Sequence, residues 1–316
     1  MSDPLARAAA VMGERARPGV LLGPLTTYRV GGPAALFCEA TSDDDLRLAA
    51  RAVEETGVAV LVIGNGSNLL VADAGFRGLA IHLGAAFAAV EVLPGARVRA
   101  GGAASLPVVA RRTAAAALTG FEWAVGVPGT IGGAVRMNAG GHGSDMRAVL
   151  ARCRVVALDG GGAARELPVE ELDLAYRQSA LRSTDVVVQA ELALEPGDRA
   201  TAEQEIAGIV RWRREHQPGG QNAGSVFTNP EGDSAGRLID AAGLKGYRRG
   251  SAQVSTKHAN FIQADEGGSA DDVWALIQEV RDHVARATGI DLVPEVRTVG
   301  FDAAGRGGRG RSGAGS

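Results

Sequence analysis

Three separated polar residues in this 316-residue chain could carry chemistry. Arg177 lies in the segment Tyr176–Ser179, and a guanidinium can stabilise a developing oxyanion without losing its charge. Ser225 stands between a glycine and an apolar pair, and its hydroxyl could donate a proton if a dry pocket and a basic partner are supplied. Glu295 is a lone carboxylate in an apolar segment, where it needs a partner or a raised pKa.

Each of these residues also has an ordinary structural interpretation. Arg177 could be a surface arginine, Ser225 a turn residue before a strand, and Glu295 one half of an ion pair with a nearby arginine. The segment around Ser225 lacks the Gly-x-Ser-x-Gly pattern of hydrolase nucleophiles. A hydrolase is therefore not indicated, and these residues alone leave the reaction open.

Two glycine-rich segments could bind an anionic or flat ligand. Gly64–Asn68 follows an apolar run, and its glycines let backbone N–H groups converge on an anion. The segment from Gly126 to Gly143 holds seven glycines and one proline and could wrap a phosphorylated ligand. Neither matches a P-loop or a dinucleotide-binding fingerprint. A plain turn for the first, and a buried crossing between subdomains for the second, remain alternatives.

The composition excludes several classes of protein. The net charge is −3, whereas a nucleic-acid-binding surface needs an excess of basic residues. No apolar run approaches the roughly 20 residues of a membrane helix, and the N-terminus lacks the apolar region of a secretory signal. The histidines and cysteines lack the spacing of metal ligands, so no metal site is predicted. Cys38 and Cys153 are expected to be buried thiols in a reducing cytoplasm.

The elements that must position the candidate residues are helices and strands in mixed order. The predicted helices cover about 43–56, 105–118, 201–216 and 269–288, from capping residues and helical spacing. The predicted strands cover 58–63, 152–158 and 186–194, from short apolar runs. Because helices and strands do not alternate as long βαβ units, the sequence predicts an α+β fold.

The order of the segments is more informative than any one of them. In this order they resemble the bacterial UDP-N-acetylenolpyruvoylglucosamine reductases, over about residues 20–300. The segments that carry the resemblance are Thr26–Gly32, Gly64–Leu70, Gly126–Gly143, Tyr176-Arg177-x-Ser179, Gly224–Pro230, Ala242–Gly246, Ser255–Phe261 and Pro294-Glu295-Val296.

The resemblance implies a PCMH-type FAD-binding fold of two subdomains with a C-terminal α+β substrate domain. We expect a leader segment over 1–19 and the FAD-binding domain over 20–197, with subdomains of about 20–100 and 101–197. The substrate-binding domain is expected over 198–302, followed by a disordered tail over 303–316.

The resemblance also assigns residues to the site. The implied contacts to FAD are Gly64, Asn65, Gly66, Ser67, Asn68, Gly126, Pro128, Gly129, Thr130, Gly132 and Gly133. The implied substrate-binding residues are Tyr176, Asn229, Lys257, His258 and Asn260. The implied catalytic residues are Arg177, Ser225 and Glu295.

The implied reaction has two halves that share one cleft. NADPH reduces FAD and leaves, and UDP-N-acetylglucosamine enolpyruvate then accepts a hydride from flavin N5 at C3 and a proton from Ser225 at C2. Arg177 and Glu295 stabilise the enolate-like charge, although Glu295 can do so only if it is protonated or acts through a hydrogen bond. Lys257 is a candidate to assist Ser225.

The chain resembles the shorter type of this family, which lacks a substrate-covering insertion. It departs from the family pattern at Thr228, at Asp265 and in the tail after Asp302. Two other functions stay open: a PCMH-type flavin oxidase, with His142 as a weak candidate for a covalent flavin link, and a flavin- or nucleotide-sugar-binding module without turnover. We expect a cytoplasmic monomer with no nucleic-acid or membrane partner.

Overall fold

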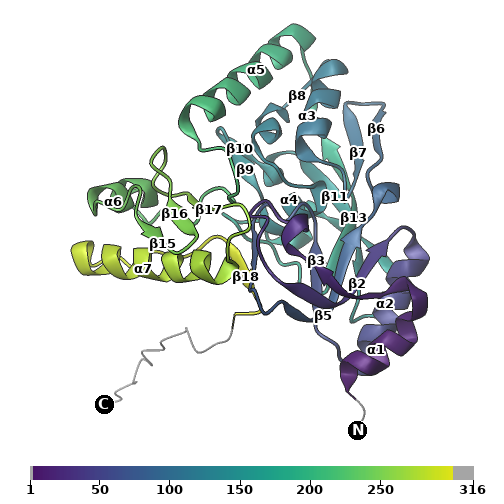
Figure 1. Cartoon of the computed structure of the whole chain (residues 1–316). Helices are drawn as coiled ribbons and strands as arrows, with labels where there is room; N and C mark the ends of the chain where they lie inside the picture. The colour runs from purple at the N-terminus through teal and green to yellow at the C-terminus, as the bar shows by residue number, and fades with distance from the viewer. Residues whose placement is uncertain (1–2, 302–316) are drawn as a thin grey trace, which may run out of the picture.

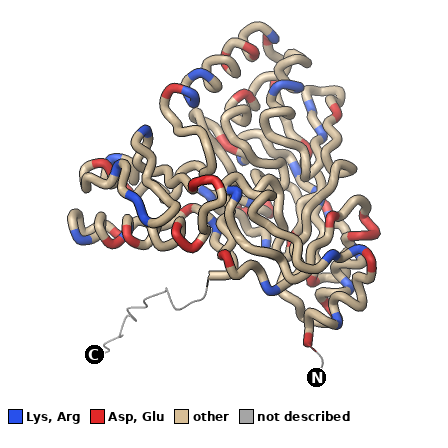
Figure 2. Tube along the Cα trace, viewed as in Figure 1, with Lys and Arg blue, Asp and Glu red and all other residues tan. Residues whose placement is uncertain are grey.

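The computed structural model describes residues 3–301 of the chain. Helices and strands are mixed along the described chain, which confirms the predicted α+β class. The predicted disordered tail over 303–316 lies outside the described residues. In this part of the chain no helix is long and apolar enough to cross a membrane. Basic and acidic residues are interspersed along the trace (Figure 2).

The N-terminal part is a four-stranded sheet with two helices beside it (Figure 1). Its elements are α1 (Pro4–Met12), β1 (Arg17–Leu21), β2 (Pro33–Ala40), α2 (Asp43–Thr56), β3 (Val60–Ile63), β4 (Leu69–Val71) and β5 (Phe76–Leu83). The strand order is β1-β2-β5-β3, with β2 and β3 parallel to β5 and β1 antiparallel to β2. α1 buries Ala8 and Met12 in the same core as α2, so the predicted leader segment packs onto the first sheet's unit.

Local sequence determines α2 over the predicted range. The Ser42 hydroxyl accepts a hydrogen bond from the Asp45 amide at the N-terminus, and Gly57 ends the helix with φ at 67°. Leu46, Ala49 and Val53 follow helical spacing and are buried.

The middle of the chain forms a five-stranded antiparallel sheet in the order β12-β11-β13-β7-β6. Its strands are β6 (Val90–Leu93), β7 (Arg97–Gly101), β11 (Leu150–Ala157), β12 (Ala164–Pro168) and β13 (Asp185–Ala193). The helices of this part are α3 (Leu106–Ala115), α4 (Ile131–Met137) and α5 (Arg199–His216). Two short pairs accompany them: β8 (Leu118–Thr119) with β14 (Glu195–Pro196), and β9 (Gly140–Gly141) with β10 (Ser144–Asp145).

Two findings differ from the sequence-based expectations. α5 begins at Arg199 because the Asp198 carboxylate, and not Thr201, caps the helix and accepts the Thr201 amide at 2.8 Å. α5 also buries Ala202, Ile206 and Ile209 in the core that contains α3. The predicted substrate domain begins with this helix, and the structure packs the helix against the middle sheet's core; the predicted domain limits stay predictions.

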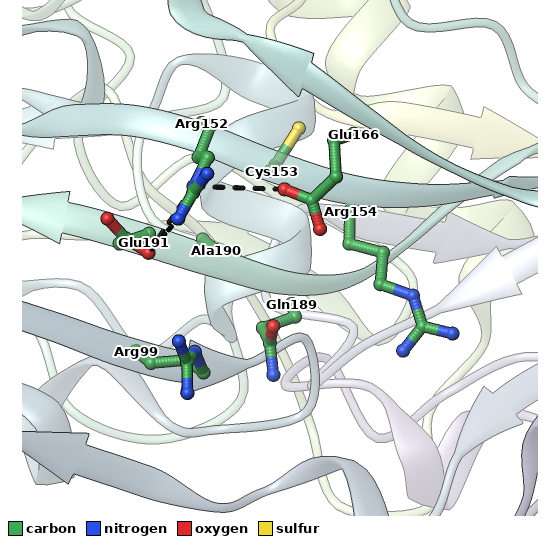
Figure 3. A pocket seen from close by; sticks show the side chains of 8 residues that line it. All are labelled: Arg99, Arg152, Cys153, Arg154, Glu166, Gln189, Ala190 and Glu191. Carbon is green, nitrogen blue, oxygen red and sulfur yellow. Dashed lines mark hydrogen bonds and ion pairs between the residues drawn. The ribbon is translucent and has the colours of Figure 1, made fainter.

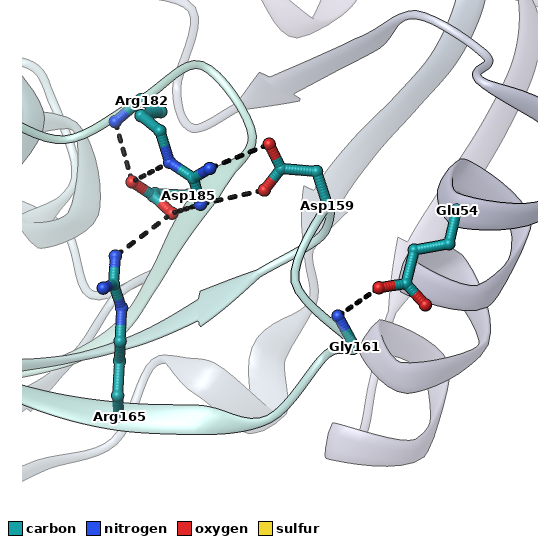
Figure 4. A network of polar contacts seen from close by, with 6 residues as sticks. All are labelled: Glu54, Asp159, Gly161, Arg165, Arg182 and Asp185. Carbon is teal, nitrogen blue, oxygen red and sulfur yellow. Dashed lines mark hydrogen bonds and ion pairs between the residues drawn. The ribbon is translucent and has the colours of Figure 1, made fainter.

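A polar network ties the middle sheet to α2 (Figure 4). The buried Asp185 carboxylate accepts the Arg182 amide at 2.7 Å and lies 3.6 Å from an Arg165 guanidinium nitrogen. Arg182 also pairs with Asp159 at 2.8 Å. At the neighbouring turn the Gly161 amide donates to Glu54 of α2. These contacts fix the turn after β11 against the first part of the fold.

The C-terminal part is a small three-stranded sheet with two helices. Its elements are α6 (Ala235–Ala241), β15 (Arg248–Arg249), β16 (Ala252–Val254), β17 (Ile262–Ala264) and α7 (Ala270–Thr288). As predicted, Ser269 caps α7 and Gly289 ends it. The last strand, β18 (Arg297–Val299), lies outside this sheet and pairs in parallel with β4. The chain therefore returns to the N-terminal part just after Glu295.

Candidate active site

The two predicted FAD loops lie against each other. Gly64–Asn68 follows β3, and Gly126–Gly133 leads into α4. The Asn65 side-chain amide donates to the Pro128 carbonyl at 3.3 Å, and a Cβ on Gly64 would lie 2.5 Å from Thr130 Oγ1. A side chain at Gly64 would therefore push the loops apart.

The first loop fits a pyrophosphate. Gly66 has φ at 56°, and a Cβ there would lie 2.5 Å from the Leu25 carbonyl oxygen, so only glycine suits this position. Within residues 3–301 the backbone amides of Asn65, Gly66, Ser67 and Asn68 donate no hydrogen bond. Four successive free donors in a glycine-rich turn are the chemistry that an anionic diphosphate needs. The residues present therefore fit the cofactor that the sequence predicts.

The second loop contains more structure than the sequence indicated. Residues Ile131–Met137 form α4, capped by the Thr130 hydroxyl, where glycine density predicted a loop. The Gly132 amide donates to the Gly102 carbonyl at 2.8 Å, and the Gly133 amide donates to Thr130 Oγ1 at 3.3 Å. These two glycines thus allow close packing, and their amides are already used within the protein.

Arg177 and Glu295 form an ion pair. Arg177 Nε lies 2.6 Å from Glu295 Oε1, although its N–H is not aligned for a hydrogen bond, and the two side chains are 25% and 15% exposed. The guanidinium also donates to the Gly140 carbonyl at 3.3 Å and lies over the Tyr176 ring. The ion pair with a nearby arginine, expected as the structural role of Glu295, is therefore present. It does not exclude a role in the reaction, because Arg177 is itself a predicted catalytic residue.

The turn that carries Arg177 is fastened to α4. Arg177 has φ at 57°, inside a turn closed by two backbone hydrogen bonds between Ala175 and Gln178. The Asn138 side-chain amide donates to the Ala175 carbonyl at 3.0 Å, and the Ser179 hydroxyl donates to the Arg136 carbonyl at 2.7 Å. The turn thus holds a non-glycine residue in the left-handed region at the site.

Burial raises the pKa of the Glu295 carboxyl group, and the Arg177 charge offsets this only in part. Sequence reasoning required a protonated Glu295 or a hydrogen bond, and the direction of this pKa shift favours the protonated form. The carboxyl group therefore sits where it can either pair with Arg177 or carry a proton.

Backbone hydrogen bonds join Glu295 to two other predicted segments. Its amide donates to the Val226 carbonyl at 2.7 Å, directly after Ser225. Its carbonyl accepts the Asn68 side-chain amide at 3.1 Å. Residues that are far apart in sequence therefore meet: the first glycine loop, the serine segment and the segment that carries Glu295.

Asn260 fixes the serine segment. Its side-chain oxygen accepts the Phe227 amide at 3.0 Å, and its side-chain nitrogen donates to the Phe227 carbonyl at 2.8 Å. Asn260 is only 4% exposed. This geometry favours a positioning role, whereas the sequence predicted substrate contact. The Ser225 hydroxyl has no hydrogen bond within the described residues.

The other predicted substrate residues are spread around this segment. The Tyr176 side chain is 62% exposed. The Asn229 side-chain oxygen accepts the Ala235 amide at 3.1 Å, and Lys257 Nζ donates to the Arg214 carbonyl at 2.5 Å. Burial lowers the pKa of His258, whose Nδ1 accepts the Asn260 amide at 3.2 Å. Lys257 thus links the serine region to the end of α5, and its assistance to Ser225 stays a prediction.

Asn138 is a positioning residue that sequence reasoning missed. It is 2% exposed, has φ at 40°, and its side chain bonds Ala175, Asp145 and the Arg147 amide. The signal was its place inside the glycine-rich segment, where an asparagine suits the left-handed conformation.

The remaining predicted features have structural partners. His142 contacts the Trp212 ring edge-on at 5.2 Å, beside Gly126. Thr228 Oγ1 donates to the Val293 carbonyl at 3.2 Å, and Asp265 pairs with Arg248. Cys38 and Cys153 are both free and buried, and burial raises the pKa of their thiols to about 11 and about 12. Among residues 3–301 no three His, Cys, Asp or Glu side chains gather as metal ligands.

Comparison with known proteins identifies the family of the chain. The model of the UDP-N-acetylenolpyruvoylglucosamine reductase C-terminal domain matches residues 216–299, and the FAD binding domain model matches residues 34–162. The chain is 46% identical to the UDP-N-acetylenolpyruvoylglucosamine reductase of Heliobacterium modesticaldum, over 87% of this chain and 88% of the relative. It is 44% identical to the reductase of the same name from a Synechococcus species, over 90% and 93%.

A solved structure shares the fold. The crystal structure of UDP-N-acetylenolpyruvylglucosamine reductase from Thermus caldophilus superposes with a TM-score of 0.79 and 34% sequence identity, covering 90% of this chain and 99% of that one. The chain therefore belongs to the family of UDP-N-acetylenolpyruvoylglucosamine reductases, FAD-dependent oxidoreductases of peptidoglycan precursor synthesis.

Proposed function

We propose that this chain reduces UDP-N-acetylglucosamine enolpyruvate to UDP-N-acetylmuramate with NADPH as reductant, and that Arg177, Glu295 and Ser225 carry the second half-reaction. The observation that supports these roles most directly is the set of hydrogen bonds that joins Glu295 to the serine segment and to Asn68. It brings the segment that carries Glu295, and with it the partner of Arg177, next to the serine segment and the first glycine loop.

Bound FAD supplies the redox chemistry of both half-reactions, since no side chain can carry a hydride. The chain's own contribution is to hold it. The free amides of residues 65–68 are proposed to bind its diphosphate, and the Asn65 side chain holds the second loop beside them through the Pro128 carbonyl.

Arg177 is proposed to stabilise the negative charge that spreads onto the substrate carboxylate when C3 accepts the hydride. Its turn is fastened by Asn138 and Ser179, so the guanidinium is held in place before the charge develops. Glu295 is proposed to be protonated during this step. A protonated carboxyl group donates a hydrogen bond to the enolate, whereas a carboxylate would repel it.

Ser225 is proposed to donate the proton that C2 accepts. Its hydroxyl has no acceptor among residues 3–301, so it is free to turn toward the substrate. Asn260 holds the backbone of Phe227, two residues further on, and so helps to fix the main chain that carries Ser225.

We also propose a cytoplasmic location, because buried free thiols suit a reducing compartment. We further propose that the protein is a monomer.

Anaerobic stopped-flow absorbance tests the proposal on the FAD-loaded enzyme. NADPH should bleach the flavin band near about 450 nm, and the enolpyruvyl sugar nucleotide should then restore it without oxygen. The Ser225→Ala variant should keep the bleaching by NADPH and lose most of the restoration. Equal loss of both half-reactions in this variant would contradict the proton-donor role. Bleaching without restoration in the unaltered enzyme would contradict the substrate.

A further inference from the structure

Asp73 follows β4 and bonds the beginning of α7, 197 residues further along the chain at Ala270. Its carboxylate accepts the Ala270 amide at 2.9 Å and the Asp271 amide at 3.2 Å, and it also accepts the Ser269 hydroxyl. In return the Asp73 amide donates to the Asp271 carboxylate at 3.2 Å. These four hydrogen bonds, which we call the Asp73 latch, join the N-terminal part of the fold to the C-terminal part.

The latch completes the N-terminus of α7. The first four amides of a helix have no partner within the helix. At α7 two of them are bonded locally, the Asp272 amide to the Ser269 hydroxyl at 3.2 Å and the Ser269 amide to the Ser251 hydroxyl at 2.8 Å. Asp73 accepts the other two, and among residues 3–301 these have no other acceptor. The positive end of the helix dipole also favours a carboxylate at this place.

The turn that carries Asp73 is held by its own part of the fold. The Gly75 amide donates to the Ala72 carbonyl at 2.8 Å, and the Gly32 amide donates to the same oxygen at 2.9 Å. A Cβ on Gly32 would lie 2.1 Å from the Asp73 carbonyl oxygen, so only glycine can approach the turn this closely. The segment Thr26–Gly32, which carries part of the family resemblance, therefore supports the latch.

β4 links the latch to the first glycine loop. The strand is three residues long, with Asn68 before it and Asp73 shortly after it. The Asn68 side-chain amide donates to the Glu295 carbonyl at 3.1 Å, and β18 pairs along the whole of β4. The C-terminal part is therefore bonded at both ends of one short strand, at the cofactor loop and at the latch.

α7 connects the latch to the segment that carries Glu295. The apolar face of the helix is buried in the core of the C-terminal part. Further along α7, Arg281 Nε donates to the Leu292 carbonyl at 2.9 Å, and the same guanidinium pairs with Asp291 at 3.1 Å. Leu292 lies three residues before Glu295. A shift of α7 would therefore displace the main chain that leads to this carboxyl group.

The ion pairs on the five-stranded sheet make a useful contrast (Figure 3). There Arg152 of β11 pairs with Glu191 of β13 at 2.8 Å and lies 3.8 Å from Glu166 of β12. The backbone ladders of β11 already join these strands, so the loss of a pair would leave the sheet in place. The latch has less support, because β4 and β18 pair over three residues only.

We propose that Asp73 is a positioning residue for the second half-reaction, acting through α7 on the segment that carries Glu295. The inference rests on the proposed function of Glu295. The Asp73 side chain lies at the surface, and the latch keeps Glu295 in register with Arg177, 2.6 Å away, and with the first glycine loop. Such register matters, because a misplacement of about 1 Å can slow a reaction about a hundredfold.

Hydrogen–deuterium exchange of the FAD-loaded enzyme tests the positioning without turnover. Asp73→Ala should speed exchange by about five- to tenfold over residues 269–273, the factor that a lost helix cap corresponds to, and should also speed it over residues 295–299. Asp73→Asn, which keeps one acceptor oxygen, should give a smaller increase at both places. This milder variant carries the test if Asp73→Ala does not fold.

Asp198→Ala is the matched control. Asp198 is likewise an exposed capping carboxylate, and it accepts the Thr201 amide and the Thr201 hydroxyl, each at 2.8 Å. The helix that it caps, α5, packs on the core of the middle sheet. Its removal should lower stability and leave exchange over residues 295–299 unchanged.

Anaerobic stopped-flow absorbance supplies the second readout. Reoxidation of the reduced flavin at saturating substrate should slow about tenfold or more in Asp73→Ala and less in Asp73→Asn, and should be normal in Asp198→Ala. Faster exchange confined to residues 269–273 overturns the proposal, because Asp73 then only caps a helix. Normal reoxidation in Asp73→Ala overturns it as well. If the substrate does not reoxidise the unaltered enzyme, the proposed function fails, and exchange over residues 295–299 alone decides whether Asp73 positions this segment.

Discussion

Removal of the Asn260 side chain should destabilise the protein and also impair one half-reaction. Asn260→Ala deletes two hydrogen bonds, of 3.0 and 2.8 Å, and leaves the buried Phe227 N–H and C=O without partners. Each unsatisfied buried group costs about 1–3 kcal/mol. The free energy of unfolding should therefore fall by about 2–6 kcal/mol.

Urea unfolding followed by circular dichroism measures this loss. Gln253→Ala is the matched control, because this partly buried side chain of β16 also makes two hydrogen bonds, donating to the Gly246 carbonyl at 3.1 Å and accepting from the exposed Arg248 guanidinium at 3.3 Å, so that water can replace its partners. It should lose only about 1 kcal/mol. In stopped-flow traces Asn260→Ala should keep flavin reduction by NADPH and slow reoxidation by substrate, since Ser225 precedes the segment that Asn260 holds. A stability equal to that of Gln253→Ala would refute the energetic argument, and unchanged reoxidation would refute the positioning role.

Three further substitutions probe the pair and the loop. Arg177→Lys should slow flavin reoxidation by substrate about 10²-fold or more, because a point charge does not replace the planar fork; near-normal steady-state turnover would remove Arg177 from the site. Burial raises the folded-state pKa of Glu295, so its contribution to the free energy of unfolding is full below the unfolded pKa and is lost as pH rises through the folded pKa. Activity should also fall as the pH rises through the folded pKa of Glu295. In Glu295→Gln neither activity nor stability should show this change with pH, as pH–rate and pH–stability profiles would measure. Profiles identical to those of the unaltered enzyme would assign the pH dependence to another group. Gly66→Ala should lower FAD retention after gel filtration, whereas Gly57→Ala, with φ at 67° and open space around it, should lower only stability, by about 1 kcal/mol; equal FAD retention in the two variants would contradict the predicted loop contact.

The sequence alone determined the elements whose signals are local. α2 and α7 begin after their capping serines and end at their terminal glycines, as predicted, because a helix cap depends on a few neighbouring residues. The first glycine loop could also be predicted from the sequence. Gly66 has a positive φ and no space for a Cβ, so the position requires glycine. The order of such segments was enough to indicate the family.

Other local signals were overridden by tertiary contacts. α4 forms although two glycines disfavour a helix, because buried Ile131 and Val135 anchor it and Gly132 bonds to Gly102. α5 begins before the predicted cap Thr201, because the Asp198 carboxylate is the N-cap and accepts a hydrogen bond from the Thr201 amide. Propensity counts only neighbours in sequence, whereas these outcomes depend on groups that compete in space.

Only the tertiary structure decided how the site is assembled. Arg177 meets Glu295 because β18 returns to pair with β4, and the Asn68 side chain and the Val226 carbonyl then bond the main chain of Glu295, just before this strand. A parallel pairing of distant strands leaves no periodic signal in either one. The resemblance implied that Asn260 contacts the substrate, and the fold shows in addition that its side chain bonds the Phe227 backbone, which no local pattern could have predicted. Residue types can be read from a sequence, but which of their hydrogen bonds remain free is settled by what the fold packs against them.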